Sequence, residues 1–254
     1  MKKLILVTND DGIEAKGVHE LIRSLGHLGE VVCVCPETPQ SGMSMALTVN
    51  EPLKVKRLED YHGAQMYRVN GTPVDCVKIA VDNLLSRKPD IVVSGINHGS
   101  NAAINVVYSG TMGAAFEGCA YGIPSIGFSL TTHDEDADFS PCMPVVDMLV
   151  KLVLDKGLPE GVCLNVNMPA HIKEYKEMRV TKSCRGRWND YYKQYVDPAQ
   201  RPFYWLAGKF ENEEPENENT DEWCLNHGIV SIVPVKLDPT YEHLNEFSWI
   251  PTDL

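Results

Sequence analysis

The sequence lacks any stretch long and apolar enough to cross a membrane, because no segment approaches the ~18 apolar residues that a spanning helix needs. The apolar run at the N-terminus, Leu4–Val7, looks like the start of a secretory signal but stops at the polar segment 8–12. It is far shorter than the roughly 7–15 residues of a signal-peptide core. We therefore expect an unexported, cytoplasmic protein with no membrane partner.

Positive charge is also scarce. The chain has 23 Lys and Arg residues against 35 Asp and Glu residues, for a formal net charge of −12. Such a chain lacks the broad basic face that phosphate backbones require, so we expect no nucleic-acid polymer as a partner. A small phosphorylated substrate is not excluded, since a bound metal ion can reverse the local field.

The eight cysteines form no CxxC pair and no zinc-finger spacing, so they do not indicate a zinc site. Cys33 and Cys35 lie two residues apart on the same side of an expected strand, which is a poor geometry for a mutual disulfide. We expect reduced and mostly buried thiols.

What the sequence does contain is an alternation of short apolar runs and helical patterns. The runs Leu4–Thr8 and Glu30–Cys35, with the helical spacing of Gly17–Leu28 between them, predict part of a parallel, helix-covered sheet. Thr72 as N-cap, followed by proline, predicts a helix to about residue 86. The further expected elements are strands at Ile91–Ser94, Ser125–Leu130, Cys163–Val166 and Ile229–Val233 and helices at Thr111–Tyr121 and Val145–Leu154.

Residues 45–70 depart from this alternation. Short segments of alternating polarity are separated there by turn residues, which is typical of antiparallel strands. We predict an antiparallel excursion with strands at Ala46–Val49, Leu53–Lys56 and Met66–Val69.

The last third of the chain has a different character. Residues 183–210 mix aromatic side chains with Arg, Gly and Pro, which indicates an arm that reaches onto a partner subunit. We expect a catalytic core over residues 1–180 and a C-terminal arm over residues 181–254, whose final strand returns to the core. The acidic run 211–222 is expected to be a solvated loop, with a second cation site as the alternative.

Oxygen-bearing side chains follow three of the expected strands. Asp10 and Asp11 follow the first strand, segment 38–42 follows the second, and segment 94–97 ends the strand that starts at Ile91. Open parallel sheets bind ligands at the carboxyl ends of their strands, near the point where strand order reverses. Adjacent carboxylates repel unless a cation lies between them or one is protonated, and hard oxygen ligands favour Mg²⁺, Mn²⁺ or Ca²⁺. The pair alone fits a helix-capping turn equally well, but the three strand ends together favour a metal.

A candidate phosphate site precedes the helix expected at Thr111–Tyr121. Ser109, Gly110 and Thr111 are small or hydroxyl-bearing residues, which leave backbone N–H groups at a helix N-terminus open to an anion. The same tripeptide is also an ordinary helix cap. It lies on the loop that follows Gly95, which places it near the expected metal.

Five ordered motifs resemble the SurE family of survival-protein nucleotidases, and two later segments match it as well. The motifs are Thr8-Asn9-Asp10-Asp11-Gly12, Pro39-Gln40-Ser41-Gly42, Gly71-Thr72-Pro73, Ser94-Gly95-Ile96-Asn97-His98-Gly99-Ser100-Asn101 and Ser109-Gly110-Thr111-Met112-Gly113-Ala114-Ala115. The later segments are Leu164-Asn165-Val166-Asn167-Met168-Pro169 and Gly228-Ile229-Val230-Ser231. The resemblance runs from Leu4 to about Thr240.

This resemblance implies an α/β fold with a Rossmann-like core, which is a mostly parallel sheet with helices on both faces. It implies an arm or hairpin exchanged between the subunits of a homodimer or homotetramer. The implied activity is metal-dependent hydrolysis of nucleoside 5′-monophosphates. Action on 3′-nucleotides, short polyphosphate or other phosphomonoesters stays open.

The resemblance also assigns site residues. The implied ligands of one Mg²⁺ or Mn²⁺ ion per subunit are Asp10, Asp11, Ser41 and Asn97. The implied phosphate-binding positions are Asn101, Ser109, Gly110 and Thr111. Asn9 and Asp10 are the candidates for the chemical step, in which Asp10 would orient or deprotonate the attacking water or form a phospho-aspartate. We assign no role to His98, which we expect to face solvent or to pack in its loop.

Three other protein classes fit less well. A haloacid-dehalogenase-type phosphatase needs an acid two residues after Asp10, where Gly12 stands. A dinucleotide-binding dehydrogenase needs GxGxxG in the first turn, which segment 9–12 does not offer. A receiver domain is shorter than this chain and needs a phosphorylatable Asp where Asn97 stands, so a receiver-like metal-binding module is the non-enzymatic alternative.

Overall fold

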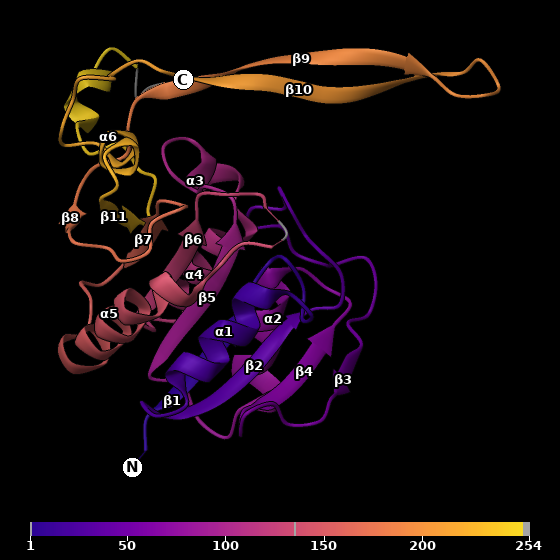
Figure 1. The fold of residues 1–254 in the computed structure, drawn as a ribbon, viewed down its shortest axis with the longest axis vertical. Coiled ribbons are helices and arrows are strands. Elements are labelled where there is room, and N and C mark those ends of the chain that lie inside the picture. Colours follow the sequence, from indigo (N-terminus) through magenta and orange to yellow (C-terminus); the bar gives the residue numbers. More distant parts are fainter. Residues whose placement is uncertain (1, 135, 251–254) are drawn as a thin grey trace.

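A nine-stranded, mostly parallel sheet forms the centre of the molecule (Figure 1). The structure is a computed structural model and describes residues 2–134 and 136–250. Its order is β3-β4-β2-β1-β5-β6-β7-β11-β8. The strands are β1 (Leu4–Thr8), β2 (Glu30–Pro36), β3 (Val55–Arg57), β4 (Gln65–Val69), β5 (Ile91–His98), β6 (Ser125–Leu130), β7 (Val162–Met168), β8 (Met178–Val180) and β11 (Val230–Lys236).

Helices connect these strands. They are α1 (Lys16–Leu25), α2 (Pro73–Ile79), α3 (Asn105–Tyr108), α4 (Gly110–Ala120), α5 (Met143–Lys156) and α6 (Asp221–Asn226), with a π-helical turn at Ala80–Leu84 and 3-10 turns at Ser140–Cys142 and Leu244–Phe247. The expected cap of α2 is confirmed, because Thr72 accepts a hydrogen bond from the Asp75 amide while the Asp75 carboxylate accepts one from the Thr72 amide. Over the described ranges, none of these helices has both the length and the apolarity of a membrane span.

The strand order reverses beside β1. This strand pairs in parallel with β2 on one side and with β5 on the other. The chain passes from β1 to β2 and only later to β5, β6 and β7, which extend the sheet in the opposite direction. The carboxyl ends of β1, β2 and β5 therefore meet at the position where open α/β sheets bind ligands.

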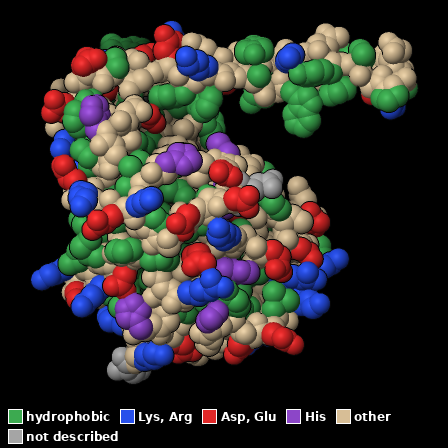
Figure 2. All heavy atoms as spheres, in the orientation of Figure 1, with side chains coloured by type: hydrophobic (Ala, Val, Ile, Leu, Met, Phe, Trp, Pro, Cys, Tyr) green, Lys and Arg blue, Asp and Glu red, His purple; other side chains and the backbone are tan. Residues whose placement is uncertain are grey.

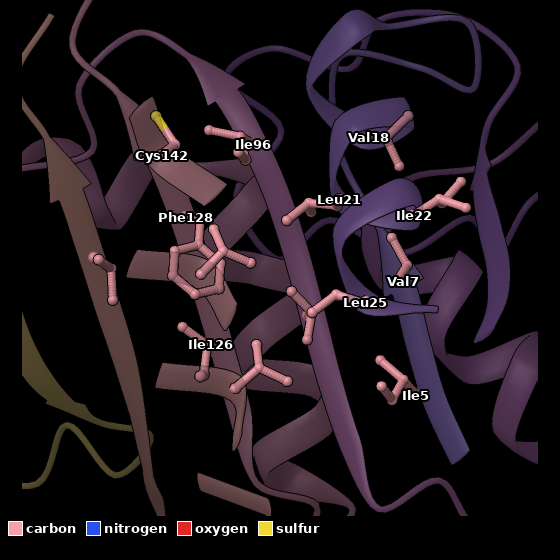
Figure 3. Close-up of a cluster of buried hydrophobic side chains, with 14 of the residues drawn as sticks. Ile5, Val7, Val18, Leu21, Ile22, Leu25, Ile96, Ile126, Phe128 and Cys142 are labelled. Atoms are coloured by element: carbon pink, nitrogen blue, oxygen red, sulfur yellow. The ribbon is translucent and has the colours of Figure 1, made fainter. Parts of the chain in front are cut away.

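The sheet has helices on both faces because its central strands are apolar on both sides. Side chains alternate along β1, so Ile5 and Val7 join the core on one face while Leu4 and Leu6 join the core on the other. The first core contains residues of α1 and α5, and the second contains residues of α2 and α4. Figure 3 shows the first core around Ile5, Val7, Val18, Leu21, Ile22, Leu25 and Phe128. All eight cysteines are buried and free, as expected.

The expected antiparallel excursion is partly wrong. β3 does pair antiparallel with β4, but β4 pairs in parallel with β2 and so continues the main sheet. Residues 46–49 form no strand. Their polar groups bind the start of α2 instead: the Ala46 carbonyl accepts a hydrogen bond from the Thr72 hydroxyl, and the Thr48 amide and hydroxyl donate to Asp75.

A long antiparallel hairpin projects from the body of the molecule as an extended arm (Figure 1). It consists of β9 (Gly186–Val196) and β10 (Pro202–Asn212), which pair only with each other among the described strands. Its aromatic side chains are exposed, with Tyr192 at 69% and Trp205 at 66%, and Figure 2 shows hydrophobic side chains gathered along the arm. The chain then returns to the main sheet as β11, which is antiparallel to β7 and parallel to β8. The α/β fold with a C-terminal hairpin is thus confirmed.

Candidate metal and phosphate site

The acidic pair lies directly after β1, where the strand order reverses. Asp10 is only 5% exposed, and its Oδ1 accepts a 2.5 Å hydrogen bond from the Thr111 hydroxyl. Burial and the neighbouring charge of Asp11 raise the pKa of Asp10 to about 6, although the Thr111 hydrogen bond acts in the opposite direction. Among the described residues no Lys or Arg pairs with either carboxylate. The protein therefore holds two adjacent acids, one of them buried, without a Lys or Arg to balance them.

The loop after β2 is hydrogen-bonded to the turn that carries this pair. The Gln40 amide donates a 2.7 Å hydrogen bond to the Asp10 carbonyl, and the next residue is the exposed Ser41. Further along, the amide and hydroxyl of Ser44 donate to two carbonyls of α3, at 3.2 and 2.7 Å. A Cβ at Gly113 of α4 would lie 2.1 Å from the Ser44 carbonyl oxygen, so only glycine permits this approach. The structure thus brings Ser41 to the same end of the sheet as the acidic pair.

Asn97 lies inside β5, whereas the sequence indicated a strand end at Ser94. The pairing of β5 with β6 shifts register between Ser94 and Asn97, an irregularity that lets the strand continue through His98. The His98 amide donates a 3.1 Å hydrogen bond to Asp11 Oδ2. The Asn97 side chain donates to the Gly99 carbonyl at 2.9 Å, and in the described ranges its amide oxygen accepts no hydrogen bond. That oxygen is free to serve as a ligand.

His98 contacts the acidic pair, which the sequence did not indicate. Its Nδ1 lies 3.7 Å from Asp11 Oδ2, and its ring packs edge-on against Phe139 at a centroid distance of 4.8 Å. Packing was one of the two expected roles, but the contact with Asp11 was missed. Its place next to Asn97 at the end of β5 was the available signal.

The N-terminus of α4 meets the acidic pair from the other side. Ser109 is its N-cap, with the hydroxyl accepting a 3.0 Å hydrogen bond from the Met112 amide. Gly110 lies so close to the first aspartate that a Cβ there would be 2.8 Å from Asp10 Cβ. A helix N-terminus favours anions. An anion bound there would lie beside two carboxylates, a repulsive arrangement unless a cation separates them.

Asn101 is held in place by asparagines of β7. Its amide donates to Asn167 Oδ1 and its carbonyl accepts from Asn165 Nδ2, both at 2.8 Å. Its own side chain donates to the Ser129 hydroxyl at 2.8 Å. In the described chain it shares no hydrogen bond with Asp10, so it frames the site from β6 and β7.

Asn9 supports the turn that carries the acidic pair. It is fully buried, and its Nδ2 donates a 2.8 Å hydrogen bond to the Gly12 carbonyl. Its Oδ1 is buried with no hydrogen-bond partner among the described residues. These contacts give Asn9 a structural role, which is to hold the turn that carries the acidic pair.

The donor set fits a hard divalent cation. It offers the carboxylates of Asp10 and Asp11, the Asn97 amide oxygen and the Ser41 hydroxyl, all of which are oxygen ligands. No group of three or more His, Cys, Asp or Glu side chains suited to a metal exists among the described residues, so this site would rest on two carboxylates with amide and hydroxyl oxygens. The uncompensated charge of the pair is the specific feature that a cation would balance.

The fold and this arrangement together define a doubly wound α/β protein whose candidate ligand site lies at the switch point of its sheet. The chain belongs to the SurE family: the family model described as "Survival protein SurE" matches residues 5–190. The resemblance inferred from the motifs is thereby confirmed.

Similar proteins cover nearly the whole chain. A protein named 5′-nucleotidase SurE from Bacteroides fragilis is 48% identical, with 98% of each chain covered. One of the same name from Flavobacterium johnsoniae is 50% identical and covers 95% of this chain and 94% of its own. The crystal structure of the Sure protein from Aquifex aeolicus matches with a TM-score of 0.83 and 37% identity, covering 96% of this chain and 98% of that one.

The raised pKa of Asp10 predicts that the stability of the metal-free protein depends on pH. The pKa is about 6 in the folded state against an ordinary value of 3.8, so the folded protein holds this proton more tightly than the unfolded chain. The resulting stabilisation is complete below about pH 3.8 and is lost as the pH rises through about 6, a loss on the order of 3 kcal/mol. Urea unfolding in chelator should show that the free energy of unfolding of Asp10→Asn rises relative to that of the wild type as the pH increases from 4 to 6. A gap that stays constant with pH would contradict the assignment.

Proposed function

We propose that this chain is a divalent-metal-dependent 5′-nucleotidase, which hydrolyses nucleoside 5′-monophosphates to nucleoside and phosphate. The relatives named 5′-nucleotidase SurE support the substrate class, since they match over nearly their full length. The observation that carries the proposal is the 2.5 Å hydrogen bond between Thr111 and Asp10. It joins the anion-binding end of α4 to the acidic pair, so a phosphate and a cation would be neighbours.

Each residue has a separate task in this proposal. The amides at the start of α4 and the Ser109 hydroxyl would hold the phosphate oxygens as charge develops on them. Thr111 lies at the same helix end, where its hydroxyl proton is donated to Asp10. Gly110 leaves room for that approach. A Mg²⁺ or Mn²⁺ ion held by Asp10, Asp11, Ser41 and Asn97 would supply Lewis-acid chemistry and lower the pKa of water.

Asp10 is our candidate for handling the proton of the attacking water. Its pKa is about 6 without metal, and a bound cation would lower it. The carboxylate is therefore ionised at neutral pH and can accept a hydrogen bond from the attacking water. The Thr111 hydroxyl fixes its direction, and Asn9 supports the turn beneath it. Asn101 would border the phosphate from the side of β6.

We also infer that the chain assembles as a homodimer or homotetramer through the hairpin. Exposed aromatics such as Tyr192 and Trp205 form an apolar surface that a second subunit would cover. The division into a core over residues 1–180 and an arm over residues 181–254 stays a prediction. β11, which lies in the second part of this division, pairs with β7 of the first.

The test is phosphate release from a panel of 5′- and 3′-nucleotides, with Mg²⁺, with Mn²⁺ and with chelator. We expect release from 5′-nucleotides with metal and a fall to background with chelator, restored by adding metal back. Activity that survives chelation would overturn the metal requirement. Stronger release from short polyphosphate would favour an exopolyphosphatase, and stable labelling by acetyl phosphate without turnover would favour a receiver-like module.

A further inference from the structure

Asp221 is a buried member of the acidic run 211–222. The sequence indicated a solvated loop here, and that expectation is wrong at this end of the run, because Asp221 is 0% exposed and begins α6. Glu218, three residues earlier, is exposed. The burial of one carboxylate in an otherwise solvated acidic run calls for partners that balance its charge.

Three backbone amides bind this carboxylate. The Ala103 amide donates to Oδ2 at 2.7 Å, and the amides of Cys184 and Glu222 donate to Oδ1 at 2.8 Å each. Among the described residues no Lys or Arg pairs with Asp221, so these three N–H groups stabilise the negative charge of the buried carboxylate. Two of them come from distant parts of the chain, 118 and 37 residues away. Asp221 therefore connects two segments that are far apart in the sequence, one at Ala103 and one at Cys184.

The first segment belongs to the substrate side of the site. Ala103 lies between Asn101 and α3, and its φ of +52° is in the left-handed region that non-glycine residues seldom occupy. An external hydrogen bond to its amide holds this strained residue in place. α3 in turn binds Ser44 through two of its carbonyls and so supports the loop that carries Ser41.

The second segment is the root of the hairpin. Cys184 lies two residues before the start of β9, and the Asp221 amide donates to the Lys182 carbonyl at 3.0 Å. A second link joins the same two segments: Trp188 Nε1 of β9 donates a 2.7 Å hydrogen bond to Asn105 Oδ1 of α3. Hairpin and site loop are thus connected at two places.

We propose that Asp221 is a positioning residue that ties the root of the β9–β10 hairpin to the loop Asn101–Asn105 and so sets the shape of the substrate site. This inference rests on the proposed nucleotidase function. It makes substrate binding depend on the hairpin, the element that we expect to contact a second subunit. Asp221 acts through the loop and does not itself touch substrate.

The test compares Asp221→Asn with the wild type in two measurements. Asn cannot accept from all three amides, because its NH₂ group replaces one acceptor oxygen. We expect amide exchange to increase in peptides covering 101–108 and 183–187 while the β1 and β5 peptides stay protected. We also expect KM for a nucleoside 5′-monophosphate to rise about tenfold with kcat changed less than about threefold. A purely structural defect would reduce the active fraction and lower kcat without moving KM.

Glu218→Gln is the matched control, since it removes the same charge from an exposed position of the same run and should leave both measurements unchanged. If Asp221→Asn does not fold, Trp188→Phe offers a second variant, because it removes the hydrogen bond from Trp188 to Asn105 at an exposed position. It should increase amide exchange in 101–108 and raise KM about threefold. Unchanged exchange in 101–108 together with an unchanged KM in a folded variant would overturn the inference. An inactive wild type would instead defeat the proposed function, while the exchange measurement would still decide whether the hairpin and loop are coupled.

Discussion

Replacing Asp10 by Asn is expected to lower the turnover of nucleoside 5′-monophosphates by at least ~10²-fold, a loss of roughly 2.7 kcal/mol of transition-state stabilisation. The amide keeps an oxygen for the Thr111 hydroxyl, which donates to Asp10 Oδ1 in the wild type. It removes the charge that a cation would balance and the group that handles the proton. Steady-state phosphate release at saturating Mg²⁺ or Mn²⁺ measures the effect.

The same variant should be more stable than the wild type in chelator at pH 7.5. Asp10 is buried and repelled by Asp11, so its neutral replacement relieves a penalty that the folded protein carries at neutral pH. Lower activity with higher stability separates a functional residue from a structural one. Asp155→Asn, at an exposed position of α5, is the matched control and should change neither property. Near-full turnover by Asp10→Asn would remove Asp10 from the mechanism.

Replacing Gly110 by Ala is expected to reduce activity by a similar factor, about 10²-fold, although the change adds one methyl group. The new Cβ would lie 2.8 Å from Asp10 Cβ and 3.0 Å from its Oδ2, and the buried aspartate has no room to move without leaving Thr111. In addition, overpacking of this kind costs about 1–3 kcal/mol of stability. Phosphate release and urea unfolding, each measured with and without metal, would show the two effects.

Gly26→Ala provides the control for this substitution. Gly26 follows α1 with a helical φ of −58°, and a Cβ there would meet nothing closer than the Ile22 carbonyl oxygen at 3.7 Å. We expect a folded protein with wild-type turnover. If Gly110→Ala behaved in the same way, the close approach of α4 to the acidic pair would not matter for activity.

Local patterns predicted the central elements well. The apolar runs gave β1, β2 and β6 within one residue, and the Thr72-Pro73 signal gave the start of α2. These features depend on side-chain periodicity and on caps, which are encoded within a few residues. Boundaries shaped by neighbours were less accurate, as the continuation of β5 through Asn97 shows.

The sequence by itself determined the fold class, the family, and the three strands near whose carboxyl ends the candidate ligands lie. Only the tertiary structure decided which groups meet there: Thr111 with Asp10, His98 with Asp11, and Gln40 with the Asp10 carbonyl. It also decided that Asp221, in a run that reads as solvated, is buried against Ala103 from 118 residues away. Periodicity and capping act over neighbouring residues, so they are visible in a single chain. Burial and long-range hydrogen bonds are set by the packing of distant segments, and a single sequence does not contain that information locally.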